Sequence, residues 1–277
     1  MTLVFDILTT SCLLFIITSG LMMIFGVMQI VNFAHGAIIS VGGYLAFCLA
    51  AAGVPPLYSA LSAFAVGFVL GALIERFIVK PLYKRPLDAI LATWGLGIVL
   101  IQLIIMIFGR SVQMVDSPIE GTWHLLGVDY SAYRLAMIPV AVVMFAVILI
   151  MLNGTLYGIK TRAVIMNEAL AQGLGINSDL IRLLTFSIGA GLGTLAGMFI
   201  TPLTSVDPYM GVAMLTNAFM IVMVSGHSFI ALMLSCLVFG LCQVIISIYI
   251  NPVVGSMAIS CLAAAVLRIR PQGFSYE

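Results

Sequence analysis

The sequence predicts an all-α fold: a polytopic integral membrane helix bundle of about eight or nine spans, some of them broken or re-entrant. The first observation is composition, because the 277 residues are 63% hydrophobic and 8% charged, whereas soluble domains carry about 25% charged residues. The second is charge patterning, since nine of the eleven Lys and Arg residues fall into three clusters between long apolar runs. These clusters are Arg76/Lys80/Lys84/Arg85, Lys160/Arg162/Arg182 and Arg268/Arg270. Basic residues collect on the cytoplasmic side of a membrane, so we expect the clusters to share that side.

Nine apolar segments account for the predicted spans. They lie at about 7–30, 37–52, 57–79, 89–108, 135–152, 183–200, 211–225, 229–248 and 253–267. A helix of roughly 20 apolar residues crosses a bilayer, so the segments at 37–52, 211–225 and 253–267 are short and could be half-helices or re-entrant. The first run lacks a basic start and carries Asp6, which predicts a retained span instead of a cleaved signal. Nine crossings that begin outside put the three clusters in the cytoplasm, with the N-terminus outside and the C-terminus inside.

Residues 1–277 are expected to form a single transmembrane domain with two longer polar stretches. The stretch at 109–134 is predicted to lie outside, where the loops are acidic: Asp6, Asp116, Glu120, Asp129 and Asp207. The stretch at 153–182 is predicted to lie in the cytoplasm, and it has helix-compatible runs broken by Gly173 and Gly175, with cap candidates at 177–179. Two ordered helices of mixed polarity suit a docking surface better than a plain linker.

The absence of several sequence motifs excludes several functions. The chain has no GxxxxGK[ST] motif, so it cannot hydrolyse ATP by a P-loop, and it has no HExxH zinc motif. Its predicted spans hold essentially no carboxylate, unlike most proton-coupled carriers and ion pumps. The net charge of +1 argues against a nucleic-acid partner, and the five cysteines lack metal-site spacing. We therefore expect neither an enzyme nor a metal site or cofactor in the chain itself.

Uncharged polar residues remain inside the predicted spans, and we expect some of them to line a solute pathway. The candidates are Asn32, His35, Thr93, Trp94, Gln102 and Asn217. Asn32 and His35 have i, i+3 spacing and would share a helical face, beside Gly36, which weakens the helix. The candidates at 93–102 are expected to face this pair across the bundle, and Asn217 to close the site. Alternatively, these groups only hydrogen-bond between helices and hold the bundle together, and the residues alone leave both interpretations open.

Three sequence blocks carry a resemblance to one family. GVMQIVNFAHGAIISVGGY (26–44) resembles the opening signature of the membrane subunits of branched-chain amino-acid ABC importers. ERFIVKPLYKRPLDAILATWGLGIVLIQ (75–102) is similar to the family's Glu-Arg…Arg-Pro-Leu…Leu-Ala-Thr-Trp-Gly block, in a form common in the related urea and short-chain amide importers. EALAQGLGIN (168–177) is similar to the family's cytoplasmic coupling segment. One departure is the late Gly-Gly-x-Gly-Ser turn, of which VSGHSFIALMLSCLVFG (224–240) keeps only Gly226 and Ser228.

The resemblance implies a permease subunit that imports a small neutral or zwitterionic solute, most readily a branched-chain amino acid, across the bacterial inner membrane. The implied partners are a second homologous permease subunit, two ATPase subunits that bind ATP-Mg, a periplasmic solute-binding protein and membrane lipid. Glu168, Ala169 and Gly175 would lie on a short cytoplasmic helix that inserts into the ATPase subunit, where Glu168 pairs with a basic residue. Gly175 would permit the turn that follows.

Other functions remain open. The same architecture could import urea or short-chain amides, as the Ala-Thr-Trp-Gly block suggests. A passive urea-type channel would suit an uncharged pore, but a channel has no need for an ordered segment at 153–182. A membrane enzyme is the weakest alternative, because the sequence holds no nucleophile–base or metal constellation.

Overall fold

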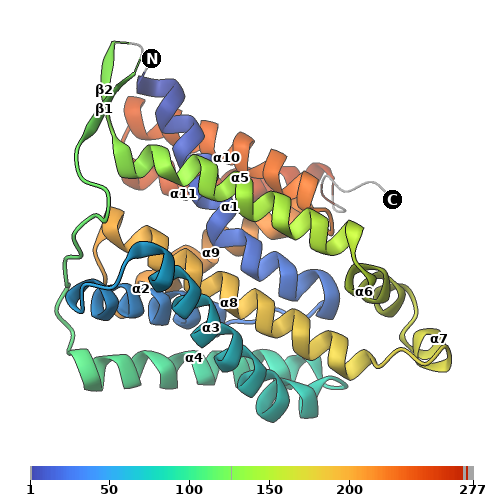
Figure 1. Ribbon diagram of the computed structural model, residues 1–277. Coiled ribbons are helices and arrows are strands. Elements are labelled where there is room, and N and C mark those ends of the chain that lie inside the picture. Colours follow the sequence, from blue (N-terminus) through green and yellow to red (C-terminus); the bar gives the residue numbers. More distant parts are fainter. Residues whose placement is uncertain (1, 126, 271–272, 274–277) are drawn as a thin grey trace.

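The computed structural model describes residues 2–125, 127–270 and 273, and this part of the chain is mostly helical (Figure 1). The predicted all-α membrane bundle is confirmed. The helices are α1 (Thr2–Met28), α2 (His35–Ala51), α3 (Pro56–Ile74), α4 (Pro86–Phe108), α5 (Ala132–Gly154), α6 (Leu156–Met166), α7 (Glu168–Gly173), α8 (Ser178–Thr204), α9 (Met210–Ser225), α10 (Phe229–Tyr249) and α11 (Pro252–Ile269). After α3 come a π-turn, η1 (Glu75–Val79), and a 3-10 turn, η2 (Lys80–Leu82), and strands β1 (Thr122–Leu125) and β2 (Val128–Ser131) form an antiparallel hairpin.

The nine predicted apolar segments correspond to nine helices of the described chain. Seven of them are long and apolar enough to cross a membrane, whereas α2 and α9 have 17 and 16 residues. The short helices predicted at 37–52 and 211–225 are therefore found. The segment at 253–267, which could have been a half-helix or re-entrant, instead forms α11, whose 18 residues are enough to cross a membrane. The Asn251 side chain caps its start by accepting a hydrogen bond from the Val253 amide (2.9 Å), and the helix continues beyond residue 267 to Ile269.

The two central helices are α1 and α8, which have the most buried apolar stretches of the spans in the described chain. Close approach to α8 depends on glycine, because small residues let helix backbones touch. A Cβ at Gly67 or Gly71 of α3 would collide with Thr194 or Ala190 of α8, and one at Gly42 of α2 would collide with the Thr194 backbone. The helices around this centre, such as α4 and α5, instead expose large apolar side chains, as lipid-facing helices do.

The elements that carry most of the charged residues lie at two opposite ends of the bundle (Figure 1). One end holds η1, η2, α6, α7 and the start of α8, and here it is called the basic end. The Lys80 ammonium lies 2.8 Å from the Asp179 carboxylate there, so the clusters at 76–85 and 160–182 meet as predicted. The other end holds the hairpin and the start of α1, and here it is called the hairpin end. The Tyr130 hydroxyl donates to the Asp6 carboxylate (2.7 Å) and joins these two elements.

Candidate functional site

A break between α1 and α2 forms the polar centre of the bundle. Helix α1 stops at Met28, and Gln29 adopts a left-handed backbone with φ 52°. The Asn32 side chain accepts a hydrogen bond from the Ala34 amide (3.1 Å), which orders the turn before α2. The Phe33 amide donates to the Thr93 hydroxyl of α4 (3.3 Å), so α4 supports the broken segment. The helix break that the sequence predicts around Gly36 thus falls just before it, at residues 29–34.

Both short helices begin inside the bundle. His35, the first residue of α2, lies against Gly193, more than halfway along α8. The Gly211 amide at the start of α9 donates to the Ser40 hydroxyl of α2 (3.1 Å), so the two starts lie side by side. From there α9 runs to the basic end, because Met223 near its C-terminus lines a cavity with Arg162 of α6. Helices that start in mid-membrane direct their partially positive N-terminal ends towards one region, which favours anionic or carbonyl groups of a solute.

His35 is fully buried, at 0% exposure, and its ring fills the space left by two glycines. A Cβ on Gly193 would lie 2.8 Å from its Cε1 atom, and one on Gly20 of α1 would lie 3.0 Å away. Neither ring nitrogen finds a hydrogen-bond partner among the described residues. Burying an unpaired charge is costly, so the ring is expected to be neutral. The Nδ2 amide of Asn32, three residues before His35, is also buried without a hydrogen-bond partner in the described chain.

The predicted pathway residues divide into three groups. Asn32, His35 and Thr93 come together at the break and are buried. Trp94 and Gln102 do not join them, because both are exposed on α4, with 58% of Trp94 accessible. Asn217 is half-buried on α9, the helix whose start meets α2. Contact of any of these six with a solute stays a prediction.

A cavity of about 1170 Å³ opens at the basic end, between α1, the α5–α6 corner and the turn from α9 to α10. Gln29 of the break lines it together with Arg162 and His227. The turn holds the sequence's departure from the Gly-Gly-x-Gly-Ser pattern, and its two remaining family residues both have structural roles. Gly226 has φ +67° and ends α9, while Ser228 accepts a hydrogen bond from the Ala231 amide (3.4 Å) and caps α10. The turn therefore keeps a glycine where the backbone is left-handed.

The predicted cytoplasmic segment at 153–182 is ordered as α6, α7 and the start of α8. Asn167 caps α7 by accepting from the Leu170 amide (3.0 Å), and Asn177 caps α8 by accepting from the Leu180 amide (3.0 Å). Glu168 and Ala169 lie on α7, as predicted. Gly175 does not, because its φ of +82° puts it in the turn beyond the helix. Glycine is suited to that left-handed position since it has no Cβ.

The surface of this segment is apolar at several exposed positions. Ile165, Met166, Leu170 and Leu174 are 39%, 86%, 62% and 73% exposed. They lie on α6, on α7 and just after it, with the exposed Ala169 between them. An apolar patch of this kind outside the long spans usually marks a protein contact.

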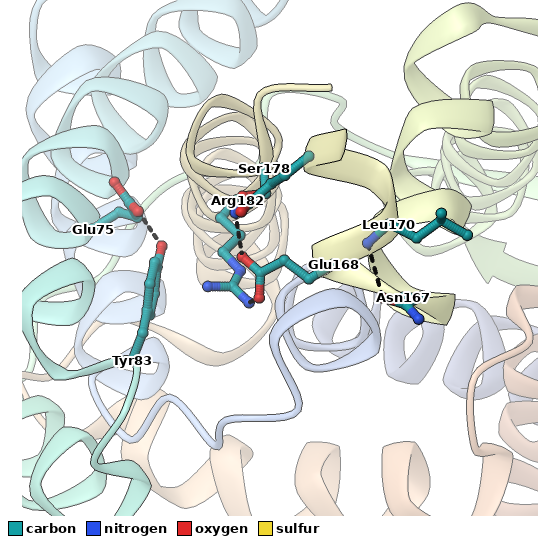
Figure 2. A network of polar contacts seen from close by, with 8 residues as sticks. Glu75, Tyr83, Asn167, Glu168, Leu170, Ser178 and Arg182 are labelled. Atoms are coloured by element: carbon teal, nitrogen blue, oxygen red, sulfur yellow. Dashed lines mark hydrogen bonds and ion pairs between the residues drawn. The ribbon is translucent and has the colours of Figure 1, made fainter. Parts of the chain in front are cut away.

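A network of polar contacts joins α7 to the end of α3 (Figure 2). The Arg182 guanidinium lies 2.6 Å from the Glu168 carboxylate and 4.4 Å from the centroid of the Tyr83 ring. The Tyr83 hydroxyl donates to the Glu75 carboxylate, the only buried carboxylate in the described chain. Burial, with the hydrogen bond to Glu75, raises the pKa of Tyr83 far above its ordinary value, so the phenol keeps its proton and donates. Sequence reasoning missed Glu75, Tyr83 and Arg182, although Glu75 beside an apolar run was a visible signal.

Comparison with known families accounts for nearly the whole chain. A family model described as "Branched-chain amino acid transport system / permease component" matches residues 3–267. A high-affinity branched-chain amino acid transport system permease protein, LivH, of Escherichia coli (strain K12) is 28% identical over an alignment of 278 positions, which covers 93% of this chain and 89% of that protein. The LivH of Salmonella typhimurium is 26% identical over 276 residues with the same coverage.

Two further comparisons agree with this. The permease protein BraD of Pseudomonas aeruginosa, also described as part of a high-affinity branched-chain amino acid transport system, is 29% identical over an alignment of 210 positions, which covers 70% of this chain and 68% of that protein. Among solved structures, PsaBC from Streptococcus pneumoniae in complex with Fab matches with a TM-score of 0.51 and 18% identity, covering 97% of this chain and 91% of that chain. At that identity the match concerns the fold alone.

Proposed function

Because the chain belongs to the family of branched-chain amino acid transport system permease components, we propose that it is the transmembrane subunit of an ATP-driven importer. The observation that carries the proposal is the ordered α6–α7 segment at the basic end, with its exposed apolar residues. The sequence has no P-loop, so an importer of this kind needs a separate ATPase, and α7 offers a place for it to dock. A passive channel would have no use for such a segment.

The substrate we propose is a branched-chain amino acid, since the relatives from three bacteria are described as branched-chain amino acid permeases. Uncharged polar groups at the break suit a zwitterion, because an amide or hydroxyl can replace lost water hydrogen bonds without holding the solute too tightly to release. Urea or a short-chain amide is the second candidate, favoured by the Ala-Thr-Trp-Gly sequence at 92–95.

We further propose the partners that such an importer requires: a second homologous permease subunit, two ATPase subunits that bind ATP-Mg and a periplasmic solute-binding protein. Trp94 and Gln102 lie on the outer face of α4, so they would meet a solute only if the second permease subunit covers that face. The exposed apolar residues of the other outer helices would meet membrane lipid.

The proposed orientation follows from the charges. With the basic end in the cytoplasm, Lys80, Arg162 and Arg182 lie on the side where basic residues collect. The hairpin end then faces the periplasm of a bacterial inner membrane, where its acidic residues would meet the solute-binding protein. In this orientation α7 lies on the side where ATP is available.

The test is to purify the chain with every bound subunit from its native membrane, reconstitute the complex in liposomes and measure uptake of labelled leucine, isoleucine, valine and urea. ATP-dependent uptake of the three amino acids, with an ATPase chain in the complex, is the expected result. ATP-dependent uptake of urea alone would select the second candidate. Uptake of urea without ATP, by a complex that lacks an ATPase, would replace the importer with a passive channel.

A further inference from the structure

The Arg182 side chain binds two segments of the chain at once. On one side its guanidinium pairs with Glu168 of α7 at 2.6 Å, and on the other it lies over the Tyr83 ring, 4.4 Å from the centroid. The side chain is only 20% exposed, so water screens these contacts less than at an open surface. A planar guanidinium can pair with a carboxylate and stack on an aromatic face together, which an ammonium does less well.

Tyr83 is fixed in turn by Glu75. The Glu75 side chain is 1% exposed, and the Tyr83 hydroxyl donates to it. A buried carboxylate without a donor is strongly disfavoured, so this contact holds Tyr83 in one place. The path from α7 to the end of α3 is therefore Glu168, Arg182, Tyr83 and Glu75. Figure 2 draws these four side chains, with dashed lines for the Glu168–Arg182 and Glu75–Tyr83 contacts.

The π-turn η1 sets the position of Glu75. The Lys80 amide donates to the Glu75 carbonyl, which is the wide bond of a π-turn. Pro81 explains why the ordinary helix does not continue, because proline has no amide hydrogen and its ring clashes with the carbonyl four residues earlier. Single π-turns inside helices occur frequently at functional sites. The nearby Lys80–Asp179 pair is about half exposed on both sides, so it contributes less than the Arg182 contacts.

Helix α7 has two other attachments among the described side chains, and one is the hydrogen bond that the Gln172 amide donates to the Ser178 hydroxyl of α8 (2.6 Å). Ala171 is its buried residue, packed in a small cluster with Val164 and Ile181. The end of α3, in contrast, belongs to a helix that packs closely on α8 through Gly67 and Gly71. The Ala171 and Gln172 contacts end on α8, whereas Arg182 and Tyr83 carry the side-chain contact from Glu168 of α7 on to the end of α3.

We propose that Glu75, Tyr83 and Arg182 are positioning residues that latch α7 to the end of α3, so that the coupling segment moves together with α3. The latch rests on the proposed function, in which α7 receives the ATPase. Glu168 then pairs within its own chain, and the exposed apolar residues of the segment are left for the partner.

The test uses the complex purified from its native membrane, with two readouts: solute transported per ATP hydrolysed, and amide hydrogen exchange of α7. Tyr83→Phe removes the hydroxyl bond to Glu75 but keeps the ring under Arg182. We expect faster exchange in α7 and a loss of transport per ATP of between about twofold and thirtyfold, the range that substitutions along coupling networks produce. Asp88→Asn is the matched control, because it breaks an exposed ion pair with Arg85 at the same end and should change neither readout.

Two double variants separate positioning from simple loss of stability. Tyr83→Phe with Glu75→Leu leaves no unpaired buried carboxylate, so it should recover stability and still transport poorly per ATP. The charge swap of Glu168→Arg with Arg182→Glu rebuilds the ion pair without the guanidinium over Tyr83. It should recover less than half of the transport per ATP that Glu168→Arg alone loses. Full recovery of transport per ATP in either double variant would overturn the latch.

The wild-type complex distinguishes the latch from the function on which it rests. If the wild type transports without ATP, the proposed function fails, and hydrogen exchange of α7 in Tyr83→Phe still decides whether the latch exists. If the wild type is coupled and Tyr83→Phe leaves both readouts unchanged, the latch fails while the importer stands.

Discussion

His35 occupies a space that exists because its neighbours on α1 and α8 are glycines. This contact joins residues that are far apart in the sequence, so no local pattern could predict it. The sequence did predict polar groups at a broken helix, and the structure brings Asn32, His35 and Thr93 together there. It could not predict that Trp94, next to Thr93, faces outward, because that depends on which side of α4 meets the break.

Gly193→Ala tests how tightly the ring is held. The added Cβ would lie 2.8 Å from the His35 ring, so we expect a loss of stability of about 1–3 kcal/mol from overpacking. Thermal unfolding of the purified complex measures it. Gly95→Ala on α4 is the control, because a Cβ there meets nothing within 4 Å, and it should raise stability by up to about 1 kcal/mol. Equal effects of the two substitutions would contradict the tight fit.

Asn32 has two separable parts, a carbonyl that accepts from the Ala34 amide and a free Nδ2 amide. Asn32→Ser keeps a capping oxygen but removes the amide, and Asn32→Leu removes both. We expect each to cut uptake about tenfold or more, since a lost hydrogen bond to a solute costs roughly 1–3 kcal/mol, while assembly with the ATPase subunits is unchanged.

His35→Leu is expected to have the same effect on uptake as Asn32→Leu. Its readouts are uptake by the reconstituted complex and the amount of ATPase that co-purifies. Normal uptake in all three variants would show that these residues only hold helices together, and that the solute passes elsewhere.

At the scale of helices and turns, the short helices at 37–52 and 211–225 were predictable because length is a local property. The latch between α7 and α3 was not. Tyr83 lies among the residues of the first basic cluster and Arg182 belongs to the second, and the packing of α3 on α8 brings them together. The position of Gly175 beyond α7 was also missed, since α7 already ends at Gly173 and the left-handed residue lies in the turn that follows.

Gly175→Val should weaken the turn between α7 and α8. Its φ of +82° disfavours any residue with a Cβ by about 1–2 kcal/mol, whereas nothing lies within 4 Å to clash. We expect lower solute-stimulated ATP hydrolysis in Gly175→Val and a smaller loss in Gly175→Asn, because asparagine tolerates this conformation. Gly173→Val, also in open space but in α7 itself, serves as the control. A loss in Gly173→Val as large as in Gly175→Val would rule out backbone conformation as the cause.

Glu168→Arg places a like charge beside Arg182, at a site where the native pair is 2.6 Å apart. Repulsion should displace α7 and abolish solute-stimulated ATP hydrolysis, while helix content by circular dichroism stays that of the wild type. If this variant couples normally, neither the ion pair nor the position of α7 matters for ATP use.

For the whole molecule, the asymmetry of charge predicted from the sequence corresponds to two physical ends. The hairpin end exposes Asp116 and Glu120, and it also carries a half-buried Asp207 and an Asp129 that lies 2.8 Å from His124. Because the screening length is about 8 Å at physiological salt, docking of a basic surface on the solute-binding protein should weaken as salt rises. Neutralising these four carboxylates should remove most of the salt dependence, measured by binding at two salt concentrations. If neither higher salt nor neutralisation of the four carboxylates weakens binding, the solute-binding protein docks on another surface.

The contacts of α2 have a consequence for inherited variation. Gly36 and Gly42 of α2 touch the backbones of α9 and α8, where a Cβ would collide with main-chain atoms that cannot rotate away. Every missense codon change at these two positions adds a Cβ, whatever the amino acid. In a library that samples all substitutions, these codons should therefore return no functional clone, while Gly26, which has open space, accepts many. The glycine positions that accept no substitution would then identify the residues of α2 that pack against α8 and α9.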